Sequence, residues 1–389
     1  MKNVTEDIYY VGVDDRKIDL FEGMYKVPEG VSYNSYIIVD EKIAVMDTVD
    51  AAFGEEWLKN VGEALRGRKP DYLVVQHMEP DHSACVQKFV EKYPEAAVVG
   101  NSKTFVMLSA YFGEDFPANR LVVSDGQELR LGKRTLKFVF APMVHWPEVM
   151  FTYEPTGGTL FSADGFGKFG ALNGNKEAWT DEARRYYIGI VGKYGVQVKG
   201  ALGKLAGLDI ARVAPLHGPV LKGESLSEAM RLYSLWSGYK AEERGVLIAC
   251  ASVYGHTRAA ASELADELVK RGVAVKVMDL ARDDWAECVA QAFRFSGLVI
   301  ASPTYNADIF PAAREFIDRL TERNYKDRTV GFMENGSWAP LSAKLMMAKM
   351  EKCKDIVFAE NSVKILSALN GESRAQIAAL AEEMVLKVK

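Results

Sequence analysis

The sequence predicts two α/β domains in series, the first with two sheets sandwiched between helices and the second with one doubly wound parallel sheet. Three observations support this prediction. The chain has 389 residues, which is long for a single domain. Strand-like and helix-like segments occur in clusters up to about residue 240. From residue 246 onward, strand, loop and helix repeat regularly, a pattern typical of a parallel sheet.

The strand candidates are short apolar runs rich in β-branched residues. In the first domain, residues 1–242, they are 35–39, 43–46, 73–75, 97–99, 135–140 and 159–162, and residues 55–59 are helix-like. A charged stretch at 240–244 marks the expected boundary. In the second domain, residues 243–389, the strand candidates are 246–250, 274–279, 298–301 and 330–333, and the helix candidates are 258–270 and 312–320.

The composition is ordinary for a soluble globular protein, with 48% apolar and 26% charged residues. The net charge of −5, from 48 basic and 53 acidic residues, argues against a nucleic-acid partner. The N-terminus lacks the apolar core of a signal peptide, and no apolar run is long enough to span a bilayer. The four cysteines include no CxxC pair, which excludes a rubredoxin-type site built from this chain. We therefore expect a cytoplasmic protein with no membrane partner.

Four side chains that can bind a metal occur within six residues, directly after the apolar run 72–75. They are His77, Glu79, Asp81 and His82. The apolar run predicts a buried strand, so the four side chains belong to the loop at its end, where a rigid sheet can direct them at one point. Two imidazoles and two carboxylates suit iron, manganese or zinc better than copper(I) or magnesium.

Three more candidate ligands, His145, Asp164 and His217, follow later strand-like or turn segments, each with Gly or Pro nearby. A lone histidine or aspartate at such a position is usually a hydrogen-bonded structural residue. A structural role of that kind does not account for seven ligand-type side chains at successive strand ends. The sequence therefore predicts one metal site that draws on all seven.

The pattern HxExDH, followed far downstream by His, Asp and His, resembles the metallo-β-lactamase fold. Most hydrolases on that fold have a histidine where this chain has Glu79. A carboxylate in place of an imidazole adds negative charge and shifts the metal preference from zinc toward iron. This exchange, together with a C-terminal flavodoxin-like domain, resembles the flavodiiron proteins (A-type flavoproteins) over essentially the whole chain. The resemblance implies a metallo-β-lactamase-like αββα sandwich followed by a flavodoxin-like doubly wound parallel sheet.

The resemblance also implies a role for each candidate ligand. His77, Glu79 and His145 would bind one iron, Asp81, His82 and His217 the other, and Asp164 would bridge the two. The equivalent of His82 is bound in some family members and displaced by water in others, which leaves its role open. The other six residues are expected to be required for catalysis.

Three loops of the second domain are predicted to bind a flavin. The first, Ser252-Val253-Tyr254-Gly255-His256-Thr257, resembles the flavodoxin phosphate loop, in which hydroxyl and backbone N–H groups at a helix N-terminus bind an anion. An ordinary capped turn is the alternative for this motif alone. The other loops are Ser302-Pro303-Thr304-Tyr305-Asn306 and Asn335-Gly336-Ser337-Trp338. Each follows a strand, at the sheet edge where doubly wound domains bind ligands. Tyr305 and Trp338 can pack against an isoalloxazine ring, although core packing is the usual fate of tryptophan.

The resemblance implies an oxidoreductase that reduces O2 to water, NO to N2O, or both, at a non-haem diiron centre. Its cofactors would be FMN, which relays the electrons, and two irons. The electron donor would be a separate protein, a rubredoxin or a rubredoxin reductase system. A head-to-tail homodimer, or a dimer of such dimers, would bring the flavin of one subunit to the irons of the other. The sequence leaves open the preference for O2 or NO, the identity of the donor, and the choice between dimer and tetramer.

Two other functions stay open at this point. One is a binuclear zinc hydrolase that activates water, with the flavodoxin domain for regulation; Glu79 argues against it. The other is an electron carrier with a vestigial metal domain; the complete ligand set argues against that. Iron and flavin in the purified protein would distinguish the oxidoreductase from the hydrolase.

Overall fold

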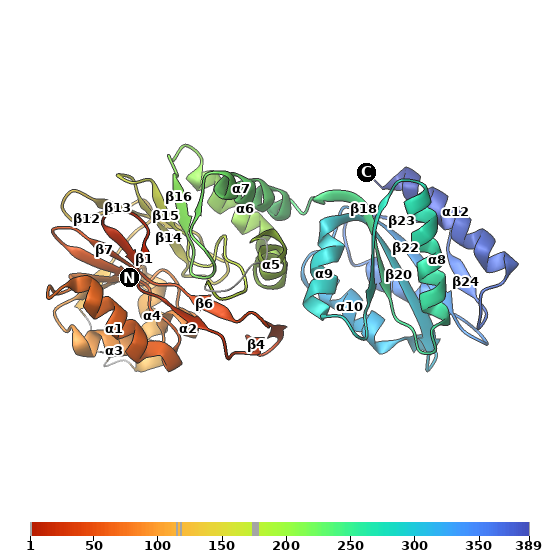
Figure 1. Cartoon of the computed structure of the whole chain (residues 1–389), viewed down its shortest axis with the longest axis horizontal. Coiled ribbons are helices and arrows are strands. Elements are labelled where there is room, and N and C mark those ends of the chain that lie inside the picture. Colours follow the sequence, from red (N-terminus) through yellow and green to blue (C-terminus); the bar gives the residue numbers. More distant parts are fainter. Residues whose placement is uncertain (1, 114–115, 117–118, 173–178, 389) are drawn as a thin grey trace. The chain divides into compact units, whose positions relative to one another are not determined.

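The structure is a computed structural model that describes residues 2–113, 116, 119–172 and 179–388 (Figure 1). The chain divides into two compact units. One comprises Met1–Tyr187 and Tyr194–Ser234, and the other comprises Ile188–Lys193 and Leu235–Lys389. The first strand of the C-terminal sheet begins at Glu243. The domain boundary between residues 242 and 243 stays a prediction.

Two mixed sheets form the centre of the first unit, with the strand orders β1-β2-β7-β8-β9-β10-β11 and β12-β13-β14-β15-β16-β17. The strands of the first sheet are β1 (Lys2–Asn3), β2 (Ile8–Tyr10), β7 (Tyr36–Val39), β8 (Ile43–Met46), β9 (Tyr72–Val74), β10 (Ala97–Gly100) and β11 (Asn119–Val122). Those of the second are β12 (Glu128–Arg130), β13 (Thr135–Phe140), β14 (Met150–Glu154), β15 (Thr159–Phe161), β16 (Arg212–Ala214) and β17 (Leu221–Lys222). Two small ribbons pair β3 (Val13–Asp15) with β6 (Val31–Tyr33), and β4 (Leu20–Phe21) with β5 (Tyr25–Lys26).

Apolar side chains from both sheets form one core between them. Met46 and Val74 of the first sheet belong to the same cluster as Phe138, Met150 and Phe161 of the second, and all five are fully buried. Burying one such side chain stabilises the fold by about 1.5–3 kcal/mol. Because the two sheets are fixed face to face, the loops at their strand ends are held in fixed positions.

Helices lie on the outer sides of the two sheets (Figure 1). The α-helices described in this unit are α1 (Gly54–Leu65), α2 (Pro80–Ser83), α3 (Val86–Lys92), α4 (Ser102–Phe112), α5 (Trp179–Tyr186), α6 (Gly195–Leu205) and α7 (Glu224–Ser237). In α1 the buried residues Trp57, Leu58 and Val61 recur at helical spacing. Arg66 ends this helix in the left-handed conformation. The predicted αββα sandwich is confirmed.

The second unit contains a parallel sheet with the order β19-β18-β20-β22-β23, to which β21 and β24 are added. The strands are β18 (Glu243–Cys250), β19 (Ala274–Asp279), β20 (Phe295–Tyr305), β21 (Asp308–Ile309), β22 (Arg328–Asn335), β23 (Ile356–Phe358) and β24 (Val363–Ile365). The helices are α8 (His256–Lys270), α9 (Trp285–Arg294), α10 (Pro311–Glu322), α11 (Ser342–Met350) and α12 (Gly371–Lys387). The order 2-1-3-4-5 along the chain is that of flavodoxin, so the predicted doubly wound sheet is also confirmed.

Most strands that the sequence pattern did not predict are short. In the N-terminal 35 residues, for example, β1 to β6 contain only two or three residues each. A run that short carries no readable periodicity, and its strand conformation depends on pairing with a neighbour. Among the described residues, none of the helices combines the length and the apolar character needed to cross a membrane.

Candidate metal and flavin sites

The predicted metal ligands come from loops at the ends of strands in the first unit. His77 follows β9, and Glu79 is the N-cap residue of the one-turn helix α2, whose first residue is Pro80. Asp81 and His82 lie on α2 itself. Proline at the first helical position turns the chain immediately after Glu79, which allows four ligand-type side chains to leave one short segment in converging directions.

The remaining three predicted ligands come from the second sheet. His145 lies between β13 and β14, Asp164 follows β15, and His217 follows β16. Ala163, next to Asp164, has a φ of +46°, in the left-handed region that favours glycine. Backbone strain of this kind is typical of residues whose neighbours are held in place for function.

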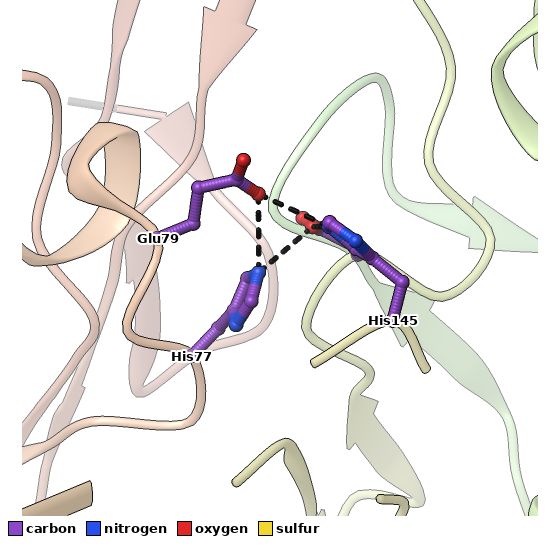
Figure 2. Close-up of side chains that lie close together, drawn as sticks. His77, Glu79 and His145 are labelled. Carbon is purple, nitrogen blue, oxygen red and sulfur yellow. Dashed lines mark hydrogen bonds and ion pairs between the residues drawn. The ribbon is translucent and has the colours of Figure 1, made fainter. Parts of the chain in front are cut away.

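The first group of converging atoms consists of His77, Glu79, His145 and one oxygen of Asp164. Figure 2 shows the two rings and the Glu79 carboxylate pointing toward one another. Nε2 of His145 lies 3.0 Å from Glu79 Oε2 and 3.1 Å from Asp164 Oδ2. Nε2 of His77 lies 3.3 Å from Glu79 Oε2 and 3.2 Å from Asp164 Oδ2.

The second group consists of Asp81, His82 and His217. Nε2 of His82 lies 3.0 Å from Nε2 of His217 and 3.2 Å from Asp81 Oδ2. The other oxygen of Asp164, Oδ1, lies 3.3 Å from His82 Nε2 and 3.6 Å from His217 Nε2. Asp164 therefore directs one oxygen at each group, which is the geometry that a bridging ligand needs. All seven predicted residues are brought together, His82 included.

Buried neighbours fix the orientation of the histidine rings. Nδ1 of His77 donates to Oε1 of Glu148 at 2.8 Å, and Nδ1 of His217 donates to the backbone oxygen of Ser32 at 2.8 Å. Each bond places the ring proton on Nδ1 and leaves Nε2 free to bind a metal. Asp47 accepts hydrogen bonds from the backbone N–H groups of Gln76 and His77, which holds the segment before the ligand cluster.

The electrostatic environment of these groups favours cations. Burial alone would lower the pKa of His77, but the charge of Asp164 and hydrogen bonds to carboxylates raise it well above its usual value. Burial would also lower the pKa of His145, but hydrogen bonds with Asp164 and Glu79 raise it to about 9. Burial would raise the pKa of Asp164, but the histidines around it hold it well below its usual range. A bound metal ion would take the place of the protons that these imidazoles otherwise attract.

The residues fit a pair of metal ions. Both oxygens of Asp81 and Oδ1 of Asp164 are buried and form no hydrogen bond within the described part of the chain. A buried carboxylate oxygen without a donor is costly unless a cation compensates it. Imidazole nitrogens together with carboxylate oxygens suit iron, manganese or zinc.

The three predicted flavin loops form one cleft of about 480 Å³ at the carboxyl ends of the strands in the second unit. Eleven of the fifteen predicted residues line it: Val253, Tyr254, His256, Thr257, Pro303, Thr304, Tyr305, Asn335, Gly336, Ser337 and Trp338. The other four, Ser252, Gly255, Ser302 and Asn306, lie in the same loops but do not line the cleft.

The polar and aromatic residues that line the cleft suit a flavin mononucleotide. The helix α8 begins at His256, and the N–H groups at a helix N-terminus can bind a phosphate. Ser252 Oγ accepts from the N–H of Gly255 at 3.1 Å and thereby shapes the loop. Tyr254 and Trp338 are 90% and 83% exposed, which leaves their rings free to cover a ligand.

The sequence pattern did not identify several residues beside these sites. Ser367 lines the flavin cleft two residues after β24, and its position after a strand end was a readable signal. Glu148 is three residues from His145, and nothing in that spacing indicates that its side chain reaches His77. Asp47 follows β8 directly, which is again a strand-end position.

Comparison with known proteins covers both units. Residues 31–218 match the family model described as ODP family beta lactamase, and residues 245–350 match that of NADPH-dependent FMN reductase. An uncharacterised protein of Methanocaldococcus jannaschii is 31% identical over 81% of this chain and 80% of its own length. The nitric oxide reductase of Moorella thermoacetica is 29% identical over 99% of this chain and 98% of its own length.

Solved structures with the same fold span the whole chain. The flavodiiron protein of Giardia intestinalis has a TM-score of 0.91 and 28% identity, covering 100% of this chain and 97% of that one. The rubredoxin oxygen:oxidoreductase of Desulfovibrio gigas has a TM-score of 0.91 and 25% identity, covering 100% of this chain and 98% of that one. With a relative above 30% identity over most of its length, both folds in this order and the converging ligand set, the chain belongs to the flavodiiron protein family.

Proposed function

We propose that this protein reduces O2 to water, NO to N2O, or both, with electrons that pass through FMN to two non-haem irons. As a flavodiiron protein it is an oxidoreductase with these cofactors. The observation that carries the proposal is the complete convergence of seven nitrogen- and oxygen-donor residues, with Glu79 among them, in a chain that also has a flavin cleft.

We assign His77, Glu79 and His145 to one iron, Asp81, His82 and His217 to the other, and Asp164 to both. Asp164 Oδ2 lies 3.1 Å from Nε2 of His145 in the first group, and Asp164 Oδ1 lies 3.3 Å from Nε2 of His82 in the second. These two distances support the assignment. Bound irons supply the electrons and the coordination sites for a diatomic substrate. Glu148 and the backbone oxygen of Ser32 accept hydrogen bonds from Nδ1 of His77 and of His217. The Nε2 atoms of both rings would therefore face the metals.

In the second unit, the N-terminus of α8 with Thr257 would hold the FMN phosphate, in the loop that Ser252 shapes, and Tyr305 and Trp338 would pack against the isoalloxazine ring. Asn335 donates to Thr257 Oγ1 at 3.3 Å and so connects the first loop to the third. We propose a rubredoxin or a rubredoxin reductase system as the donor. The name of the Desulfovibrio gigas relative supports a rubredoxin, and the four free cysteines of this chain form no CxxC pair that would replace it.

We propose a head-to-tail homodimer, alone or paired into a tetramer, as the working assembly in the cytoplasm. Exposed apolar side chains beside both sites support a partner surface there: Tyr254 and Trp338 at the flavin loops, and Leu20 and Met24 in the β4–β5 ribbon. The ribbon belongs to the metal site, because the Phe21 ring packs edge-on against His217 at 5.3 Å.

The hydrolase alternative is not favoured. The relatives with known activities are named as reductases of nitric oxide or as a rubredoxin oxygen:oxidoreductase. A carboxylate, Glu79, is one of the donors in the first group, where a zinc hydrolase of this fold would have histidine.

The deciding experiment measures steady-state gas consumption by the purified protein in anaerobic buffer to which either O2 or NO is added. NADH, a rubredoxin reductase and rubredoxin serve as the electron donor. We expect two irons and one FMN per chain and sustained consumption of at least one of the gases. A preparation with two zincs, no iron and hydrolytic activity toward thioesters would overturn the proposal. The ratio of the two turnover rates determines the preferred substrate.

A further inference from the structure

We propose that Glu148 is a positioning residue for His77 and that it makes the two metal groups unequal. The first group, with His77, Glu79 and His145, would then hold iron more tightly and at a lower reduction potential than the second, with Asp81, His82 and His217. This inference rests on the diiron site proposed above.

Glu148 is fully buried, and its carboxylate is fixed from two directions. Oε1 accepts from Nδ1 of His77 and from the backbone N–H of Met78, both at 2.8 Å. The backbone oxygen of Glu148 accepts from Nδ2 of Asn101, the N-cap residue of α4. The carboxylate therefore cannot leave the His77 ring without also losing its bond to the Met78 N–H, while the Asn101 bond holds the backbone of Glu148 in place.

A carboxylate on Nδ1–H has a defined effect on a ligand histidine. It fixes the tautomer and the ring orientation, and it pushes electron density toward Nε2, which makes the imidazole a stronger donor to the metal. Changes to such a partner typically weaken metal binding by about 10- to 100-fold. His77 therefore binds its metal as a stronger and better-oriented ligand than an unsupported histidine.

The histidines of the second group have no such support. Nδ1 of His217 donates to a neutral backbone oxygen, that of Ser32. Nδ1 of His82 is buried and has no hydrogen-bond partner within the described ranges of the chain. Both imidazoles are therefore weaker donors than His77.

The charge of Glu148 acts in the same direction. Each group has one carboxylate of its own, Glu79 or Asp81, and the groups share Asp164. Glu148 adds one more buried negative charge next to the first group. Because charges interact more strongly in a protein interior than in water, this charge favours the ferric over the ferrous ion in the first group.

The wild-type protein provides the primary test. Diferrous protein is titrated anaerobically with a chelator until half of the iron is removed, and the two sites are then compared by iron anomalous diffraction. We expect the remaining iron at His77, Glu79 and His145. Equal occupancy, or iron left mainly at His82 and His217, would overturn the inference. A wild-type protein that binds no iron at all would instead overturn the proposed function.

Variants separate the hydrogen bond from the charge. Glu148→Gln has nearly the same shape but no charge, and Glu148→Asp keeps the charge. We expect Glu148→Gln to weaken iron binding in the first group by about 10- to 100-fold. We also expect it to bring the reduction potentials of the two irons closer together in an EPR-monitored redox titration. The iron affinity and the reduction potentials of Glu148→Asp should be closer to those of the wild type than the values of Glu148→Gln.

Glu22→Gln is the matched control. Glu22 lies at the turn of the β4–β5 ribbon, where burial and the charge of Glu79 raise its pKa to about 7. Above that pH it acts on the metal groups through its charge, whereas Glu148 holds its histidine through a direct hydrogen bond, so the two variants are compared above pH 8. We expect this variant to shift the potentials less than Glu148→Gln and to leave the iron affinity unchanged. Equal effects of the two variants would mean that charge alone sets the inequality, and the positioning role of Glu148 would be wrong. If Glu148→Gln does not fold, the wild-type titration still tests the inequality of the two groups, and Glu148→Asp compared with Glu22→Gln tests the role of Glu148.

Discussion

Nε2 of His82 lies 3.0 Å from Nε2 of His217, and both rings are buried. Because Nδ1 of His217 donates to Ser32, the Nε2 of the neutral ring carries a lone pair. Two imidazole nitrogens this close need either a proton, as in a hydrogen bond from His82, or a metal ion between them. The same neighbourhood contains the carboxylate of Asp81, whose two oxygens are buried without a hydrogen bond in the described structure. The second metal group is therefore arranged for a metal ion and is less stable without one.

Metal removal should destabilise the first domain and not the second. A ligand that binds only the folded state at about 1,000 times its Kd stabilises that state by about 4 kcal/mol. We expect chelation under anaerobic conditions to lower the melting temperature of the first domain by several degrees, measured by calorimetry, and ferrous iron to restore it. The melting transition of the flavin domain should not move. In His82→Ala, which keeps the first group intact, chelation should cause a smaller decrease. A chelator-insensitive melting temperature in wild type would contradict this prediction.

Replacing Asp164 with alanine should remove the connection between the two groups. Both of its oxygens face histidines of different groups, so its loss leaves His77 and His82 without their shared partner. We expect turnover with O2 and NO to be abolished and iron content to fall, while FMN absorbance persists because the flavin cleft is formed by the other unit.

The control for this change is Asp125→Ala, the same substitution at a half-exposed aspartate of the same unit that binds Lys204. It should keep normal iron content and turnover. Near wild-type turnover in Asp164→Ala would show that the assigned bridge is wrong.

Electron transfer should cross between subunits of the proposed dimer. One chain type carries His77→Ala with Asp164→Ala and has no metal site, and the other carries Thr257→Glu with Trp338→Ala and has no flavin site. Glutamate at Thr257, a buried side chain beside Asn335, places a negative charge at the proposed position of the FMN phosphate. Each parent should be inactive. The purified heterodimer should recover one working pair, about half of the wild-type rate per dimer. No recovery in a verified heterodimer would mean that transfer runs within one chain.

The flavin domain should lose stability in acid through Glu383 on α12. Burial alone would raise the pKa of this carboxyl, but Lys387 and the N–H groups of Glu360 and Asn361 outweigh burial and lower it from 4.5 to about 2. A lowered folded-state pKa means that the stabilisation is complete above pH 4.5 and is lost as the pH falls from 4.5 through about 2.

We expect Glu383→Gln to reduce the free energy of unfolding at pH 7 by about 1–2 kcal/mol, measured by urea titration. The difference from wild type should shrink below pH 4.5, because the wild-type carboxyl then takes up a proton on unfolding. Glu360→Gln, at an 89% exposed side chain that also approaches Lys387, should change little. A constant difference between pH 7 and pH 3 would show that the charge of Glu383 is not the cause.

The sequence determined more of the chemistry than of the small structural elements. Apolar runs followed by His77 and Asp164 identified strand ends, and strand ends of a rigid sheet are where ligands can meet. Glu79 in place of a histidine indicated iron. The phosphate loop at Ser252–Thr257 could be read because its residue types and its place between a strand and a helix agree. Strands of two or three residues such as β4 could not be read, because pairing partners stabilise them and not their own periodicity.

Only the tertiary structure decided which atoms meet. Sequence order places Asp164 at a strand end, but the packing of two sheets face to face directs Oδ2 at His145 and Oδ1 at His82. Glu148 is 71 positions from His77 in the chain, and its contact with that ring exists because the loop after β13 lies against the loop after β9. Local sequence fixes the conformation of a segment and the direction of its side chains, whereas distances of about 3 Å between distant segments depend on how the whole core packs.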